Sequence, residues 1–193
     1  TLGVLWLTIA TDWRSLIFTS QVGVFLYSLP YIEMFSYRSN VELNSFATGM
    51  VFAFGVLFFS IATLSLLKNN SKQKTVDVIV AMVNAIYAVV WIFNQESTTV
   101  QSIMLLFVAL LYASGTFFIF RITNDVQTFL LYFVAALSMV MLATFIQFGA
   151  DARLFLLASQ AVFATYFIKK LLQKENDAYT AFIVIVNAVP VYL

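Results

Sequence analysis

Six uncharged polar residues are predicted to lie deep within long apolar stretches of this chain. They are Gln21, Ser60, Thr63, Asn84, Gln160 and Asn187. Hydrocarbon cannot satisfy the donors and acceptors of an Asn or Gln side chain, so these groups must bond to neighbouring helices. One interpretation is that they hold helices together, for about 0.6–2 kcal/mol each. The other is a polar seam that contacts a small solute, with Asn84 and Gln160 as its candidate residues.

The sequence offers few residues that could catalyse a reaction, bind a metal or carry a proton. The chain has no Cys and no His, so it lacks a thiolate and the commonest metal ligand and general base. Its ten basic and nine acidic residues are expected in connections or near helix ends. Glu33 and Asp77 come closest to entering a helix, and both are expected to lie at the membrane interface. We therefore predict no catalytic residue, metal or cofactor here, do not expect an enzyme, and expect any transport not to be driven by protons.

The balance of apolar and charged residues predicts a membrane protein. Of the 193 residues, 62% are hydrophobic and 10% are charged, whereas a soluble domain has about 25% charged residues. The net charge of +1 provides no basic field that could hold nucleic acid. The partners that we expect are the lipid bilayer, other membrane-protein subunits and the rest of a longer parent chain.

The apolar stretches predict helices that cross a bilayer, because a hydrocarbon core of about 30 Å needs roughly 20 apolar residues. Eight segments are found, at residues 1–10, 15–32, 46–67, 76–93, 100–120, 126–148, 153–168 and 178–193. Short connections predict antiparallel neighbours. The predicted fold is an all-α polytopic transmembrane bundle, with one helical region over residues 1–193. Both ends lie in apolar runs without a signal peptide, so we expect the first and last segments to be truncated.

The basic residues predict the orientation of the bundle. Eight of the ten lie in the connections at residues 11–14, 68–75, 121–125 and 169–177, and the other side carries Arg38 and Arg153. Cytoplasmic connections are enriched in Lys and Arg. The first set of connections is therefore expected in the cytoplasm.

A short internal repeat links two of the predicted helices. Val83-Asn84-Ala85 and Val186-Asn187-Ala188 both follow a connection rich in Lys. The two are four helices apart, and an even number of helices preserves orientation. The match indicates a parallel repeat of four helices, or a coincidence in a strongly biased composition.

The order of short motifs from about residue 76 onward resembles a known family. The motifs lie at residues 83–87, 109–112, 146–149, 151–153 and 158–161. Together they resemble a family of large bacterial polytopic membrane proteins of unknown function, over the last two-thirds of the chain. The resemblance implies a longer parent protein in a bacterial inner membrane and no particular activity. Gln160 stands where that family often has Glu, and the family's preceding Trp is absent, so a role for a carboxylate at that position is not implied.

Two functions of different kinds fit these observations. The first is a non-enzymatic transport or channel-like module, which a water-accessible cavity lined by Asn84 and Gln160 would favour. The second is a structural subunit that packs against partner proteins or lipid, which a dry and fully packed bundle would favour. An enzyme acting on lipid-linked substrates is the weakest alternative, because the stretch offers no catalytic set.

Overall fold

The chain folds entirely into helices where the structure describes it. The computed structural model describes residue 3 and residues 15–37, 41–68, 74–95, 97–123 and 125–172. Within these ranges there are six α-helices and no strand. The helices are α2 (Ser15–Tyr37), α3 (Val41–Leu67), α4 (Lys74–Phe93), α5 (Thr98–Thr123), α6 (Val126–Gln147) and α7 (Ala150–Leu172).

Six of the eight predicted segments coincide with these helices. The first and the last, at residues 1–10 and 178–193, lie outside the described residues apart from Gly3. A bundle of about eight segments is therefore not supported. The same holds for the four-helix repeat, because Asn187 lies outside the described residues as well.

Several helices extend beyond the predicted apolar runs. The segment predicted to begin at residue 46 begins at Val41, and the one predicted to begin at residue 153 begins at Ala150. The helix α2 continues through Pro30 to Tyr37. Apolar runs end where polar side chains begin, whereas helical backbone bonds continue until the chain must turn, so hydropathy alone underestimates helix length.

Four helices are long and apolar enough to cross a membrane. The spans are Thr48–Leu67, Lys74–Phe93, Thr98–Thr123 and Val126–Gln147. Ser15–Pro30, the part of α2 in which side chains are described, is also apolar. The helix α7 was also predicted to cross but is not among the four spans found in the described residues.

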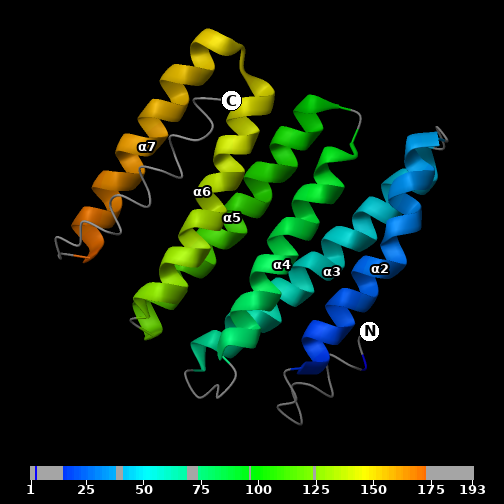
Figure 1. Cartoon of the computed structure of the whole chain (residues 1–193), viewed down its shortest axis with the longest axis horizontal. Helices are drawn as coiled ribbons and strands as arrows, with labels where there is room; N and C mark the ends of the chain where they lie inside the picture. Colours follow the sequence, from blue (N-terminus) through cyan, green and yellow to red (C-terminus); the bar gives the residue numbers. More distant parts are fainter. Residues whose placement is uncertain are drawn as a thin grey trace.

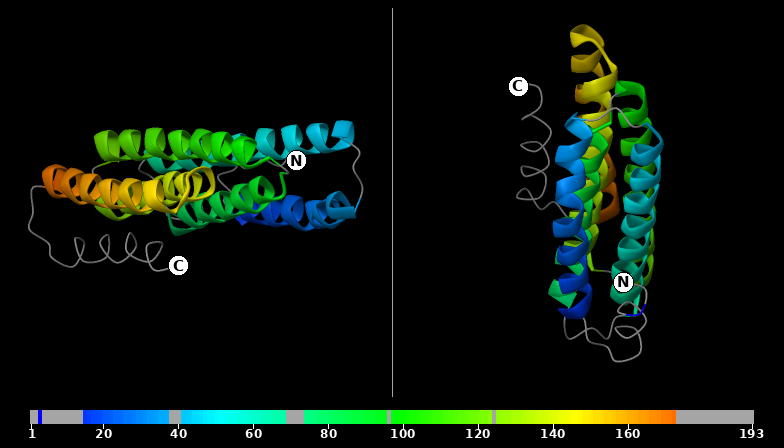
Figure 2. Two further views of the ribbon diagram at one scale, coloured as in Figure 1. Left: turned by 90° about the horizontal axis from the view of Figure 1, so that it is seen from above. Right: turned by 90° about the vertical axis from the view of Figure 1, so that its right-hand side faces the viewer.

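Successive helices run antiparallel, and α4 lies at the centre of the bundle (Figure 1). It packs against α2, α3, α5 and α6, whereas α7 packs on α6. Seen from above, α3 and α5 lie on one side of the bundle, and α2 and α4 lie on the other (Figure 2). Because α4 contacts four other helices, the polar side chains on its buried face meet residues of several helices.

Aromatic side chains fill the contact between α3, α5 and α6. The Phe59 ring lies 4.9 Å from the Tyr112 ring and 6.0 Å from the Tyr132 ring, between centroids. A Cβ atom added at Gly115 would lie only 3.0 Å from atoms of Phe59 and Tyr132. The close approach of these three helices therefore requires glycine at position 115 of α5.

Candidate functional site

The candidate site is built on the buried face of α4. Asp77, Ala81 and Asn84 are buried on this helix. Their spacing of three and four residues places them on one side of the helix. The site therefore runs along α4 from its first turn towards its middle.

Asp77 is buried, with 1% of its surface exposed. The Ser65 hydroxyl on α3 donates a hydrogen bond of 2.5 Å to Oδ2 of Asp77. Asp77 was predicted to lie near a helix end, and it does lie in the first turn of α4; its burial was not predicted. Because α3 and α4 pack antiparallel, the last turns of α3 cover the first turn of α4 and enclose the carboxyl group. Glu33 was the other carboxylate expected at the interface; it belongs to α2, but its side chain lies outside the described residues.

Two tyrosine hydroxyls lie in the same buried polar region as Asp77 and Ser65. The Tyr132 and Thr63 hydroxyls lie 3.2 Å apart, and either can donate. The Tyr112 hydroxyl donates to the carbonyl oxygen of Ala81 at 2.5 Å, and the Tyr112 and Tyr132 rings are 5.5 Å apart. Residues of α3, α4, α5 and α6 thus meet in one buried polar cluster.

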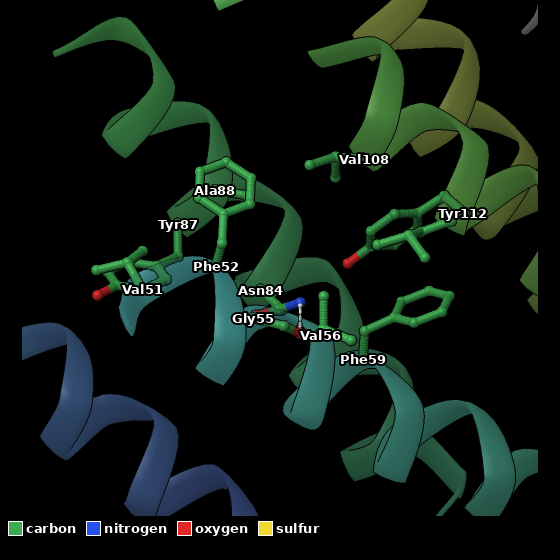
Figure 3. A pocket seen from close by; sticks show the side chains of 11 residues that line it. Val51, Phe52, Gly55, Val56, Phe59, Asn84, Tyr87, Ala88, Val108 and Tyr112 are labelled. Carbon is green, nitrogen blue, oxygen red and sulfur yellow. Dashed lines mark hydrogen bonds between the residues drawn. The ribbon is translucent and has the colours of Figure 1, made fainter. Parts of the chain in front are cut away.

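Asn84 lies at the inner end of this cluster and lines a small cavity (Figure 3). Its side chain is 4% exposed, and Nδ2 donates to the carbonyl oxygen of Gly55 at 2.9 Å. Its Oδ1 accepts no hydrogen bond from the described residues. The cavity measures about 20 Å³, which is room for about one water molecule. Tyr87 and Tyr112 also line it, and most of its lining is apolar.

Gln21 joins the site from α2. Its side chain is 2% exposed, and Nε2 donates to the carbonyl oxygen of Val80 at 3.0 Å. The carbonyls of Val80 and Ala81, adjacent on α4, thus each accept a side-chain donor from a different neighbouring helix. Such bonds satisfy polar groups that hydrocarbon would leave unpaired.

Polar contacts continue along α4 towards its other end. The Tyr87 hydroxyl donates to the Ser28 hydroxyl of α2 at 2.9 Å. Beyond the helix end, Nε2 of Gln95 donates to the Thr48 hydroxyl of α3 at 3.2 Å. The central helix is therefore tied to its neighbours over its whole length.

The structure divides the polar seam that the sequence predicts. Gln21, Thr63 and Asn84 lie around α4, whereas Nε2 of Gln160 on α7 donates to the Thr144 hydroxyl on α6 at 2.8 Å. The expectation that Asn84 and Gln160 bond within the bundle is confirmed, but they do not share one cavity. The Ser60 hydroxyl donates to Val56 on its own helix.

Asn187, the remaining predicted seam residue, lies outside the described residues. The sequence analysis missed Ser65, Asp77, Tyr112 and Tyr132 as members of the site. One signal was present, because Asp77 and Asn84 are seven residues apart and so share a helix face.

An ion pair closes the end of the bundle nearest Asp77. Lys74, the first residue of α4, pairs with Asp125, which precedes α6. Burial alone would raise the pKa of Asp125, but hydrogen bonds from Lys74 and Thr128 and the Lys74 charge hold that pKa below its usual value of 3.8. The pair brings the α3–α4 and α5–α6 connections to the same end of the molecule, as the predicted topology requires. Among the described residues, no group of three or more acidic, His or Cys side chains could hold a metal ion.

Comparisons of the chain with protein-family models, curated proteins and solved structures give no match. The resemblance to bacterial polytopic membrane proteins therefore stays a prediction. What the protein does must be inferred from its own residues.

Proposed function

We propose that the chain is a multi-pass integral membrane protein in which α3, α4, α5 and α6 cross the bilayer. Their length and apolar character support this proposal. Large apolar side chains also cover the outside of the bundle, such as Leu110 at 68% and Phe117 at 65% exposure. In water so much exposed apolar surface would be unfavourable. The excess of basic residues supports a cytoplasmic location for the Lys74–Asp125 end, and the family resemblance supports a bacterial inner membrane.

Within this membrane bundle, the proposed function is transport or channel-like conduction past the inner face of α4. The observation that carries the proposal is Asp77, which is 1% exposed in an apolar bundle. A buried carboxyl group is costly in apolar surroundings. Ser, Thr or Asn could supply interhelical hydrogen bonds at lower cost. A buried carboxyl therefore favours a role in binding a proton or a small cation.

The residues around Asp77 suit such a role. An ionised Asp77 accepts the Ser65 hydrogen bond, and a protonated Asp77 can itself donate. The Thr63 and Tyr132 hydroxyls can exchange donor and acceptor roles. Asn84 adds a buried acceptor, Oδ1, that receives no hydrogen bond from the described residues. The sequence led us to expect transport that is independent of protons, because the carboxylates lie at or near helix ends. Asp77 does lie in the first turn of α4, but its burial supports proposing it as a proton or cation site.

The second candidate is a structural subunit, and the size of the Asn84 cavity favours it. At about 20 Å³ this cavity holds nothing larger than a water molecule. The donors of Gln21, Asn84 and Tyr112 all end on helix carbonyls, which ties the bundle together. On this alternative Asp77 serves only to join α3 and α4 through Ser65.

Proton flux in liposomes separates the two candidates. The protein would be reconstituted with a pH-sensitive dye inside the vesicles, and the internal pH followed after an external acid step, with and without Na⁺ or K⁺. Transport through the site predicts flux above empty liposomes, and its loss in Asp77→Asn. Asp125→Asn is the matched control, because it removes a carboxylate at the same end but outside the bundle core.

Each outcome decides between the candidates. Flux that Asp77→Asn abolishes and Asp125→Asn leaves intact supports transport past Asp77. Wild-type flux equal to that of empty liposomes, in protein that retains its helical circular dichroism, leaves the structural subunit. Flux that survives Asp77→Asn would show that Asp77 is not on the path.

A further inference from the structure

A large groove opens between α5, α6 and α7, away from the Asn84 cavity. Its volume is about 790 Å³, within the usual range for small-molecule sites. Six phenylalanines line it: Phe117, Phe120, Phe129, Phe133, Phe163 and Phe167. We call it the Phe groove. Among the described residues, Arg121 is the one charged residue in its lining, and none of those that line it is acidic.

One wall of the Phe groove is formed by stacked rings. The Phe133 ring lies 5.7 Å from the Phe167 ring at an interplanar angle of 14°. Phe129 stacks on Phe133 at 6.1 Å and 18°, and Phe163 on Phe167 at 6.0 Å and 16°. Because each ring packs on the next, the wall joins α6 to α7 and is formed before anything binds. The groove is thus a preorganised apolar surface.

The charged end of the Phe groove lies at the end of the bundle predicted to face the cytoplasm. Arg121 is exposed in the last turn of α5. Lys169 and Lys170 are exposed in the last turn of α7, two and three residues beyond Phe167. The groove therefore has an apolar body and a basic mouth.

The length of the groove matches one leaflet of a bilayer. From Ala113 to Arg121, both in its lining, α5 rises about 12 Å at 1.5 Å per residue. Half of the hydrocarbon core is about 15 Å. We propose that the Phe groove binds one anionic phospholipid, with an acyl chain along the stacked rings and the head-group phosphate at Arg121.

The charge at the mouth decides which lipid binds. Every lipid tail is apolar, so the phenylalanines alone give little preference for one lipid over another. A guanidinium forms strong, bidentate hydrogen bonds to phosphate. In a zwitterionic lipid the head-group cation is repelled by Arg121 and the nearby lysines, whereas an anionic head group is attracted. Basic pockets between helices on the cytoplasmic side commonly select anionic lipids in this way.

Native mass spectrometry of the full chain in detergent tests this proposal. The protein would be mixed with equimolar phosphatidylglycerol and phosphatidylcholine that carry identical acyl chains, and retained lipids would be identified by mass. The wild type is expected to retain one phosphatidylglycerol in preference. Arg121→Gln should lower that retention about five- to tenfold, and Arg121→Lys should retain most of it. Lys68→Gln is the matched control, since Lys68 is exposed at the same end of the bundle, after α3.

A groove-filling variant tests the apolar part separately. Ala113 lines the groove and is exposed, so Ala113→Trp places an indole where the acyl chain would lie. It should reduce retention of both lipids without changing the unfolding temperature. Unchanged retention in Ala113→Trp would overturn the proposed position of the acyl chain.

Two further results would overturn the proposal. The first is equal retention of both lipids by the wild type, or equal effects of Arg121→Gln and Lys68→Gln. The second concerns residues 178–193, an apolar segment of this chain that could fill the groove instead. The chain has no Cys, so the pair Ala113→Cys and Phe182→Cys can be oxidised cleanly. Complete cross-linking that excess phosphatidylglycerol does not reduce would assign the groove to that segment.

Discussion

Asn84 and Gly55, which are 29 residues apart in the sequence, join the centres of α4 and α3 by a hydrogen bond of 2.9 Å from Nδ2 to the Gly55 carbonyl oxygen. The other amide atom, Oδ1, is buried and accepts no hydrogen bond from the described residues. One side chain thus both fixes two helices and holds a buried acceptor at their contact. The two roles can be separated, because a change at Gly55 alters the space near Oδ1 without removing the carbonyl acceptor.

Alanine at two glycines should have opposite effects on stability. At Gly115 an added Cβ lies 3.0 Å from Phe59 and Tyr132 atoms, whereas at Gly55 its nearest neighbour is Oδ1 of Asn84 at 3.8 Å. Gly115→Ala should cost about 1–3 kcal/mol from overpacking. Gly55→Ala should be neutral or stabilising, because alanine favours the helix. Unfolding in mixed detergent micelles measures both. Equal destabilisation by the two variants would show that α3, α5 and α6 do not approach closely at Gly115.

The deep amides were predictable from the sequence because an Asn or Gln in a long apolar run has nowhere to bond except another helix. Their grouping was not predictable. Gln160 and Asn84 are alike in the sequence, yet Gln160 bonds to Thr144 of α6 whereas Asn84 bonds to Gly55 of α3. Which helices become neighbours depends on packing between segments far apart in the chain, and hydropathy carries no information about it.

The position of Asp77 shows a second limit of sequence reasoning. Hydropathy places it one turn inside a helix, where a side chain could reach the interface. It is buried because the last turns of α3, which contain Ser65, pack against the start of α4. Tyr112 and Tyr132 were missed for a similar reason. From the sequence, a tyrosine in an apolar helix is expected only to pack against its neighbours, and only the structure shows that its hydroxyl bonds to another helix.

Acid should weaken the Lys74–Asp125 link. The pKa of Asp125 is lower in the folded protein than its usual value of 3.8, so the pair stabilises the fold above about pH 4 and is lost as the pH falls through the lowered pKa. Both side chains are partly exposed, at 50% and 17%, so the contribution is about 1 kcal/mol or less. Unfolding temperatures measured from about pH 6 to pH 2 should converge for wild type and Asp125→Asn at the acid end. A constant difference across the range would contradict this assignment.

The topology can be tested with single cysteines in a chain that has none of its own. Lys68 after α3 and Ser97 before α5 are both exposed, and α4 lies between them. If α4 crosses the membrane, Lys68→Cys should react with an impermeant maleimide only in inverted vesicles, and Ser97→Cys only in intact spheroplasts. The excess of basic residues sets this direction. Reaction of both positions from one side would mean that α4 does not cross.

The Gln160–Thr144 hydrogen bond should be the main polar link between α7 and α6. Nε2 of Gln160 donates to the Thr144 hydroxyl at 2.8 Å, whereas Ala164 and Ile168 of α7 pack on apolar side chains of α6. A double-mutant cycle with Gln160→Leu and Thr144→Val removes each partner while keeping similar volume. The coupling free energy between them should be about 0.6–1.7 kcal/mol, the range found for hydrogen bonds between membrane helices.

The control is a second double-mutant cycle that pairs Gln160→Leu with Thr128→Val. Thr128 lies near the opposite end of α6 and contacts Asp125 instead of Gln160, so this cycle should show no coupling free energy. Coupling in both cycles, or in neither, would mean that Gln160 does not hold α7 to α6 through Thr144.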